Sequence, residues 1–173
     1  FWVAPSFKLY TSVLAEAVAR HPGSIARRAR LVALFHAAVI DAQIAACDAK
    51  YTAYLRWRPV TALRENGRPD WTPLHETPAH PDYPSNHNTY AAAAETVLTA
   101  EFGPRPLRPF TIESPEAPGA PRRYTRWRQL TDENIGARIW SGIHTRAADE
   151  AGAELGRDTA RHALRHAGTL LSA

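Results

Sequence analysis

The chain has 173 residues, 45% of them hydrophobic, and its 21 Lys and Arg residues against 17 Asp and Glu residues give a formal net charge of +4 (21 − 17). This length suits one domain with a real core, and the small basic excess suits an anionic substrate or cofactor without requiring nucleic acid. A single cysteine excludes an internal disulfide bond, and the chain lacks a run of about 18 apolar residues, so we expect no transmembrane segment.

The chain begins at Phe1 without a methionine, and no signal peptide is visible. We therefore expect that residues 1–173 are a single helical domain and the C-terminal part of a longer chain. Localisation stays open, with a secreted or periplasmic protein slightly favoured over a cytoplasmic one. Formation of a homo-oligomer also stays open.

Apolar residues at helical spacing, together with helix-stop signals, predict five helices. They cover residues up to about 20, 24 to about 54, 85 to about 102, about 125 to 140, and about 146 to 166. Gly103 and Gly168 mark two of the predicted ends. Gly152 and Gly156, four residues apart on the last helix, predict a close approach to a neighbouring helix.

Two long segments between these helices are predicted to be loops. Residues 57–84 contain six prolines, and residues 104–123 are rich in proline and arginine. A loop of this length inside a compact domain is usually functional. The sequence therefore predicts an all-α helical bundle with long active-site loops.

Residues 80–88 carry the densest pattern of chemically active groups, because a proline-rich loop runs there into Ser85, a good N-cap residue. The helix start that follows presents unpaired backbone N–H groups, including that of Asn86, and the positive end of the helix dipole. Such a helix start is a natural seat for an anion. His87 adds an imidazole whose ordinary pKa, near about 6.5, suits proton transfer at neutral pH.

Two other segments supply cations and a second imidazole. Lys50 and Arg58 lie upstream, whereas Arg138 and His144, six positions apart, lie downstream. Guanidinium groups match the oxygens of tetrahedral anions such as vanadate and phosphate. Together with Ser85, these side chains predict a site that holds one tetrahedral oxyanion.

The three blocks are DAKY with WRPVTALR at 48–64, HPDYPSNH at 80–87 and ARIWSGIH at 137–144. Their order resembles the vanadium-dependent haloperoxidases and their relatives, the type 2 phosphatidic acid phosphatases and bacterial acid phosphatases. The residues are most similar to the bacterial haloperoxidase-like branch, and the resemblance covers residues 41–156. It implies the same helical-bundle fold with long active-site loops.

By this resemblance, His144 is the metal ligand that binds vanadate, or in a phosphatase the nucleophile that becomes phosphohistidine. His87 is the acid/base residue in both chemistries. The cofactor, vanadate, or phosphate in the same site, would lie among Lys50, Arg58, Ser85, Asn86 and Arg138. For His80 two interpretations stay open: it lines the halide or substrate side, or it bonds its own backbone.

The chain departs from the family pattern in the spacing of its first block. Seven residues separate Lys50 from Arg58, where the family has six. One extra residue rotates a helical side chain by roughly 100°. Either the end of the helix adjusts, or Lys50 is misplaced and Arg56 takes its role.

Two further departures concern single residues. Asn86 stands where the family usually has glycine, and Ala148 stands where the phosphatase pattern has an aspartate, with Asp149 one position later. We expect the first to affect the shape of the cavity more than anion binding. The second disfavours a phosphatase relay and points modestly towards the haloperoxidases.

The leading hypothesis is an enzyme that oxidises halide with hydrogen peroxide at a His144-bound vanadate, and thereby halogenates a small organic substrate. The runner-up is an acid phosphatase, a phosphomonoesterase that cleaves a phosphate ester through the same residues. A third hypothesis is a non-catalytic helical module that uses the arginines to bind an anion or RNA. Its signature would be salt-dependent nucleic-acid binding that survives His144→Ala.

Overall fold

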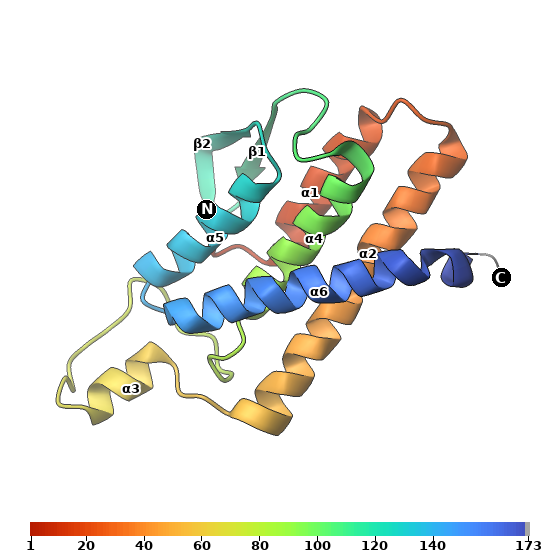
Figure 1. Cartoon of the computed structure of the whole chain (residues 1–173). Helices are drawn as coiled ribbons and strands as arrows, with labels where there is room; N and C mark the ends of the chain where they lie inside the picture. Colours follow the sequence, from red (N-terminus) through yellow and green to blue (C-terminus); the bar gives the residue numbers. More distant parts are fainter. Residues whose placement is uncertain (172–173) are drawn as a thin grey trace.

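A computed structural model of the protein describes the backbone of residues 1–171 and the side chains of residues 1–168. Figure 1 shows the elements, which in chain order are α1 (Ser6–Ala19), α2 (Ile25–Asp48), the π-helix η1 (Ala49–Tyr54), α3 (Pro59–Glu65), α4 (Asn86–Phe102), β1 (Phe110–Ser114), β2 (Ala117–Tyr124), α5 (Arg128–Trp140) and α6 (Arg146–Leu171). The predicted helical bundle is confirmed, with one small two-stranded sheet added to it.

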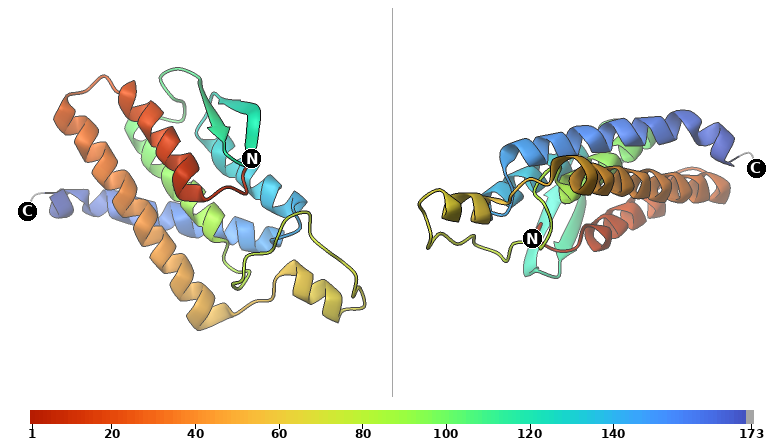
Figure 2. Two further views of the ribbon diagram at one scale, coloured as in Figure 1. Left: turned by 180° about the vertical axis from the view of Figure 1, so that it is seen from behind. Right: turned by 90° about the horizontal axis from the view of Figure 1, so that it is seen from below.

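Helix α4 is the centre of the bundle, because it packs against α1, α2, α5 and α6. Helix α6 crosses α4 and α2 in Figure 1. Seen from below, α1 and α6 lie on opposite sides of α2 (Figure 2). A helix with neighbours on so many sides must be apolar nearly all round, and the run 91–94 consists of four buried alanines.

The contact between α4 and α6 is close because glycines face it. A β-carbon at Gly152 would overlap the carbonyl oxygen of Ser85, and one at Gly156 would overlap that of Thr89. The predicted close helix approach is therefore confirmed. It brings the beginning of α6 against the first turn of α4, the turn that follows the loop at 80–85.

The stretch Ile25–Glu65, which contains α2, is long and apolar enough to cross a membrane by length and composition. An 18-residue window in the helical stretch Ile25–Glu65 has a mean hydropathy of 1.5, and 39% of that window is buried. Leu34, Phe35 and Ala38 of this helix are buried inside the bundle. Core helices meet the same criteria, so the expected absence of a transmembrane segment stays a prediction.

Both predicted loops contain regular structure that the sequence analysis missed. Within residues 104–123, β1 pairs with β2 in an antiparallel hairpin with Phe110 opposite Tyr124. Alternate side chains of β1 are buried against the core, whereas β2 contains two prolines and is mostly exposed. The other loop, 57–84, begins with α3, which has a proline at its first position.

The helix ends were predicted to within a few residues, with one exception. Ser24 caps α2 by accepting a hydrogen bond from the backbone N–H of Arg27. Gly103 ends α4 with a φ of 76°. Gly168 was predicted to stop the last helix and does not, since α6 continues to Leu171.

Candidate anion-binding site

Arg58 joins the loop before α4 to the turn between α5 and α6. Its Nε donates to the carbonyl oxygen of His80 at 2.8 Å, and its Nη1 donates to that of Ile143 at 2.7 Å. Nη1 also lies 2.9 Å from Nε2 of His144. Arg58 is 5% exposed. Since it belongs to the first predicted block and bonds residues of the second and third, it brings all three blocks into contact.

His144 contacts the loop at residues 80–85 directly, as a site built from the second and third sequence blocks requires. Its Nδ1 lies 2.6 Å from Oδ1 of Asp82, three residues before Ser85. Burial lowers the pKa of His144 to about 3, against the opposite effect of the hydrogen bond to Asp82. Asp82 was missed by the sequence analysis, although an aspartate inside the HPDYPSNH block was the available signal.

The extra residue between Lys50 and Arg58 is absorbed by the π-helix η1. The backbone N–H of Leu55 donates to the carbonyl of Lys50 at 3.2 Å, five residues back. A π-turn holds about one residue more than an α-turn and occurs often at functional sites. Lys50 is 1% exposed, with its Nζ 3.0 Å from Nδ1 of His80. Arg56, the alternative, is exposed.

His80 lies inside this group of cations. Nδ1 of its ring is 3.0 Å from both Nζ of Lys50 and Nη2 of Arg58. Ammonium and guanidinium groups only donate, so this nitrogen accepts. Burial, then Lys50 and Arg58, lowers the pKa of His80 to about 4, and the ring is neutral at neutral pH. Nδ1 of His80 also lies 3.3 Å from the carbonyl oxygen of Pro81, so both interpretations of His80 stay open.

Ser85 begins α4 as predicted, but its hydroxyl does not cap the helix. Its backbone N–H donates to the carbonyl of Ala148 at 2.9 Å. Nδ2 of Asn88 lies 3.5 Å from the hydroxyl oxygen and donates to Oδ1 of Asp149 at 2.6 Å. Burial raises the pKa of Asp149 to about 7, against the opposite effects of Ser85 and Asn88. The start of α6 thus holds a buried carboxyl group beside the start of α4.

Arg138 differs from Arg58, because its side chain has no hydrogen-bond partner among residues 1–171. Arg138 is 1% exposed, and its Nε is buried and unpaired within that range. Burial lowers its pKa to about 10, and the neighbouring Asp149 opposes that shift. A buried polar atom left unpaired costs about 1–3 kcal/mol. The side chain therefore suits an anionic ligand as its partner.

His87 follows Ser85 by two positions, and its ring is close enough to Arg138 and His144 for both to affect its pKa. Burial, then Arg138, holds that pKa well below the ordinary value. Nε2 of His87 is buried without a partner among residues 1–171. A neutral ring with an unpaired nitrogen suits a proton acceptor.

Asn86, which replaces the family's glycine, directs its side-chain amide at Gln43 and Cys47 of α2. Its Nδ2 lies 3.4 Å from Oε1 of Gln43, whose Nε2 donates to the Asn86 carbonyl at 2.9 Å. Among non-glycine residues 1–171 a positive φ occurs at Leu55 and not at Asn86. The substitution therefore ties the start of α4 to α2.

The departure at Ala148 does not separate the two chemistries. Ala148 is buried, and the carboxylate that contacts His144 comes from Asp82 instead. The absence of an aspartate at this position therefore does not leave His144 without a carboxylate partner, and the inference that it disfavours a phosphatase stays a prediction.

Two open cavities flank the segment Leu55–Trp57 beside this site. One, of about 400 Å³, is lined by Arg58 and His80 among other residues. The other, of about 770 Å³, is lined by Trp57 and Tyr83 and reaches Asp82. The first offers small molecules a route to the cations.

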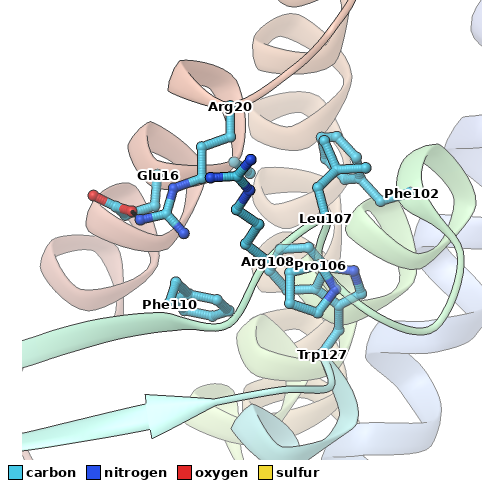
Figure 3. Close-up of a pocket in the computed structure, with 9 residues that line it drawn as sticks. Glu16, Arg20, Phe102, Pro106, Leu107, Arg108, Phe110 and Trp127 are labelled. Atoms are coloured by element: carbon cyan, nitrogen blue, oxygen red, sulfur yellow. Dashed lines mark ion pairs between the residues drawn. The ribbon is translucent and has the colours of Figure 1, made fainter.

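A third hollow lies away from the site, between α1, α4 and β1 (Figure 3). Its volume is about 10 Å³, enough for about one water molecule. Glu16 and Arg20, labelled in Figure 3, form an ion pair at its rim. None of the predicted site residues lines it, so it has no part in the chemistry considered below.

Fold and site together define a helical-bundle protein with three basic side chains, Lys50, Arg58 and Arg138, hereafter the cationic cluster, buried near the start of its central helix. Burial, then Arg58, lowers the pKa of Lys50 to about 7, so a bound anion would favour its charged form. The family described as "VCPO second helical-bundle domain" matches residues 30–173, and the chain belongs to this family and to the vanadium haloperoxidase superfamily.

Solved structures agree with this assignment. A structure described as the first bacterial vanadium-dependent iodoperoxidase is 29% identical, with a TM-score of 0.81 over 90% of this chain and 38% of that one. An apo-type bacterial vanadium-dependent chloroperoxidase is 18% identical, with a TM-score of 0.70 over 86% of this chain and 39% of that one, and shows the fold alone. The chain thus spans well under half the length of either protein. No curated protein matches it.

Proposed function

We propose that the protein is a vanadium-dependent haloperoxidase, which oxidises halide with hydrogen peroxide and passes the oxidised halogen to a small organic substrate. Family membership supports this proposal, and one observation carries it. The guanidinium of Arg58 contacts the rings of both His80 and His144, and Nζ of Lys50 contacts the ring of His80.

The residues present fit vanadate as their ligand. Vanadate would be bound through Nε2 of His144, with the cationic cluster, the Ser85 hydroxyl and the Asn86 N–H as its hydrogen-bond donors. The unpaired buried Nε of Arg138 is a donor that such an oxyanion would satisfy. Bound vanadate supplies a Lewis acid that polarises peroxide for attack by halide.

The protein's own contribution is charge, orientation and one proton acceptor. The cationic cluster is buried, so its electric field is screened less than it would be in water. Nε2 of His87 would accept a proton from peroxide, since the lowered pKa keeps this ring neutral at neutral pH. His80 and the cavity beside it lie where halide would approach.

A second candidate is an acid phosphatase that cleaves a phosphate ester, and the Asp82–His144 pair favours it. A carboxylate on Nδ1 leaves Nε2 of His144 with its lone pair, as a nucleophile requires. His87 would then serve the leaving alcohol as its acid/base residue. The same cluster would hold phosphate in place of vanadate.

A nucleic-acid module is the weaker reading, because Arg58 and Arg138 are 5% and 1% exposed. Arginines that contact a phosphate backbone must reach the surface. Salt-dependent RNA binding that survives His144→Ala would nevertheless favour it.

The deciding experiment measures peroxide- and bromide-dependent halogenation of a dye, with and without added vanadate, beside hydrolysis of an aryl phosphate. We expect halogenation that requires vanadate and is lost in His144→Ala. Fast phosphate release without halogenation, even with vanadate, would instead identify the phosphatase. Iodide and chloride in place of bromide would then define the halide.

A further inference from the structure

Hydrogen-bond partners on both sides of the His144 ring fix which nitrogen carries its proton. Nη1 of Arg58 lies 2.9 Å from Nε2, and a guanidinium group can only donate. Nε2 therefore accepts, and the proton is on Nδ1, which lies 2.6 Å from Oδ1 of Asp82. The two partners thus require the same tautomer.

Asp82 is itself held rigidly. Its second oxygen, Oδ2, accepts from the hydroxyl of Thr145 at 2.6 Å and from the Thr145 backbone N–H at 3.4 Å. The backbone N–H of Asp82 donates to the carbonyl of Arg56 at 2.8 Å. Asp82 is 2% exposed, so water competes little for these bonds. Its carboxylate cannot turn without breaking contacts on both sides.

We propose that Asp82 is the positioning residue of this site, which holds the His144 ring with its proton on Nδ1, so that the Nε2 lone pair, which accepts from Arg58 in this structure, is the one that a bound oxyanion would meet. The inference rests on the proposed oxyanion site, in either its peroxidase or its phosphatase form. A histidine that binds a metal commonly donates its other ring proton to a carboxylate, which orients the ring and raises its basicity. Here that carboxylate comes from 62 residues before His144 in the chain.

A purely structural role is the alternative, in which Asp82 only ties the loop to the turn before α6. The two roles differ in what happens to the His144 ring when the charge is removed and the shape is kept. Asp149 offers a matched control: it is a second buried aspartate, but it bonds Asn88 rather than the ring.

The test compares Asp82→Asn with Asp149→Asn by NMR of the protein labelled with ¹⁵N-histidine. The His144 signals are assigned as those that disappear in His144→Gln. We expect an unprotonated Nε2 in the parent and in Asp149→Asn, and a partly or fully protonated Nε2 in Asp82→Asn. Calorimetric titration with inorganic phosphate and with orthovanadate should show affinity for both falling about 10- to 100-fold in Asp82→Asn.

Thr145→Val keeps Asp82 but removes the hydroxyl that holds it, so it should shift the ring in the same direction by less. Thr145→Ser keeps that hydroxyl and should behave as the parent. This pair keeps the test decisive if Asp82→Asn fails to fold.

An unchanged His144 ring and unchanged phosphate affinity in Asp82→Asn, or in Thr145→Val where only that variant folds, would overturn the proposal. A parent that neither halogenates dye nor hydrolyses phosphate esters, but still shows the shift in Asp82→Asn, would refute the proposed function and leave the positioning role standing.

Discussion

The site has two halves that differ in how far the protein itself satisfies them. The loop half, Arg58, His80, Asp82 and His144, is joined by hydrogen bonds between its own members. The helix half, Ser85, His87, Arg138 and Asp149, retains three buried atoms without a partner among residues 1–171: His87 Nε2, Arg138 Nε and Asp149 Oδ2. We infer that the loop half keeps its shape unaided, whereas the helix half responds to a ligand.

The largest expected effect is a loss of stability in a variant that disrupts the loop half. Arg58→Ala removes the donor to the carbonyls of His80 and Ile143 and leaves Asp82 without its nearby cation. Losing one member of a buried charged network costs about 3–5 kcal/mol, so the unfolding free energy should fall by about that amount. Urea denaturation measures it, with the exposed Arg105→Ala as control. A stability equal to that of the control would show that the loop half does not depend on Arg58.

The matched change in the helix half should affect ligand affinity strongly and stability little. Arg138→Met fills similar space and removes a buried charge without a hydrogen-bond partner among residues 1–171. The unfolding free energy should therefore change by less than about 1 kcal/mol, or rise, because no partner is left unpaired. Affinity for inorganic phosphate should fall roughly 100-fold, as expected for a lost charged hydrogen bond. Parallel denaturation and calorimetry test both, and a large loss of stability would remove the distinction between the halves.

The sequence predicted more of the helix half than of the loop half, for a physical reason. Ser85, Asn86 and His87 are neighbours at a helix start, and local chain geometry alone brings their groups together. Asp82 acquires its role only through a contact with His144, 62 residues away, and its place inside the HPDYPSNH block was the one local signal of that role.

The π-helix and the hairpin were missed for related reasons. Residues 49–54 look like the end of an α-helix, and only the spacing to Arg58 hinted at an extra residue in the turn. Strand β1 alternates over five residues, and β2 carries two prolines that are typical of an edge or a loop. Its partner strand, rather than its own sequence, makes β2 a strand.

Acid should set the buried histidines of the site against its buried carboxyl group, Asp149, because the two kinds of group titrate with opposite effects on stability. Burial lowers the pKa of His80 to about 4 and that of His144 to about 3, against an ordinary value of 6.5. As pH falls from 6.5 towards 4, the unfolded chain binds protons at these rings and the folded chain does not, so stability falls. His87, with its lowered pKa, acts in the same direction.

Asp149 opposes this loss. Its pKa is raised from 3.8 to about 7, so its stabilising contribution is complete below pH 3.8 and is lost as pH rises through 7. Three histidines outweigh one carboxyl, and we expect a net loss of stability on acidification. Asp149→Asn should make this loss steeper. Urea denaturation at pH 7, 6, 5 and 4 measures the unfolding free energy of the parent and of Asp149→Asn, with the exposed His162→Gln as control. If the unfolding free energy falls equally steeply with pH in both proteins, the Asp149 carboxyl does not titrate in this range.

The smallest expected effect concerns the link between the helix half and the rest of the bundle. Asn86→Gly restores the residue usual in the family and removes the bond from Asn86 to Gln43. A lost hydrogen bond and a glycine in the first helical turn should lower the unfolding free energy by about 1 kcal/mol. Phosphate affinity should change less than about threefold, because the Asn86 side chain points to α2 while its N–H remains. Gln43→Ala and the double variant complete a double-mutant cycle. The two losses of unfolding free energy should be less than additive, because both single variants remove the same hydrogen bond between Asn86 Nδ2 and Gln43 Oε1. A tenfold loss of phosphate affinity in Asn86→Gly would mean that the start of α4 is positioned by α2, and not by its close packing against the glycines of α6.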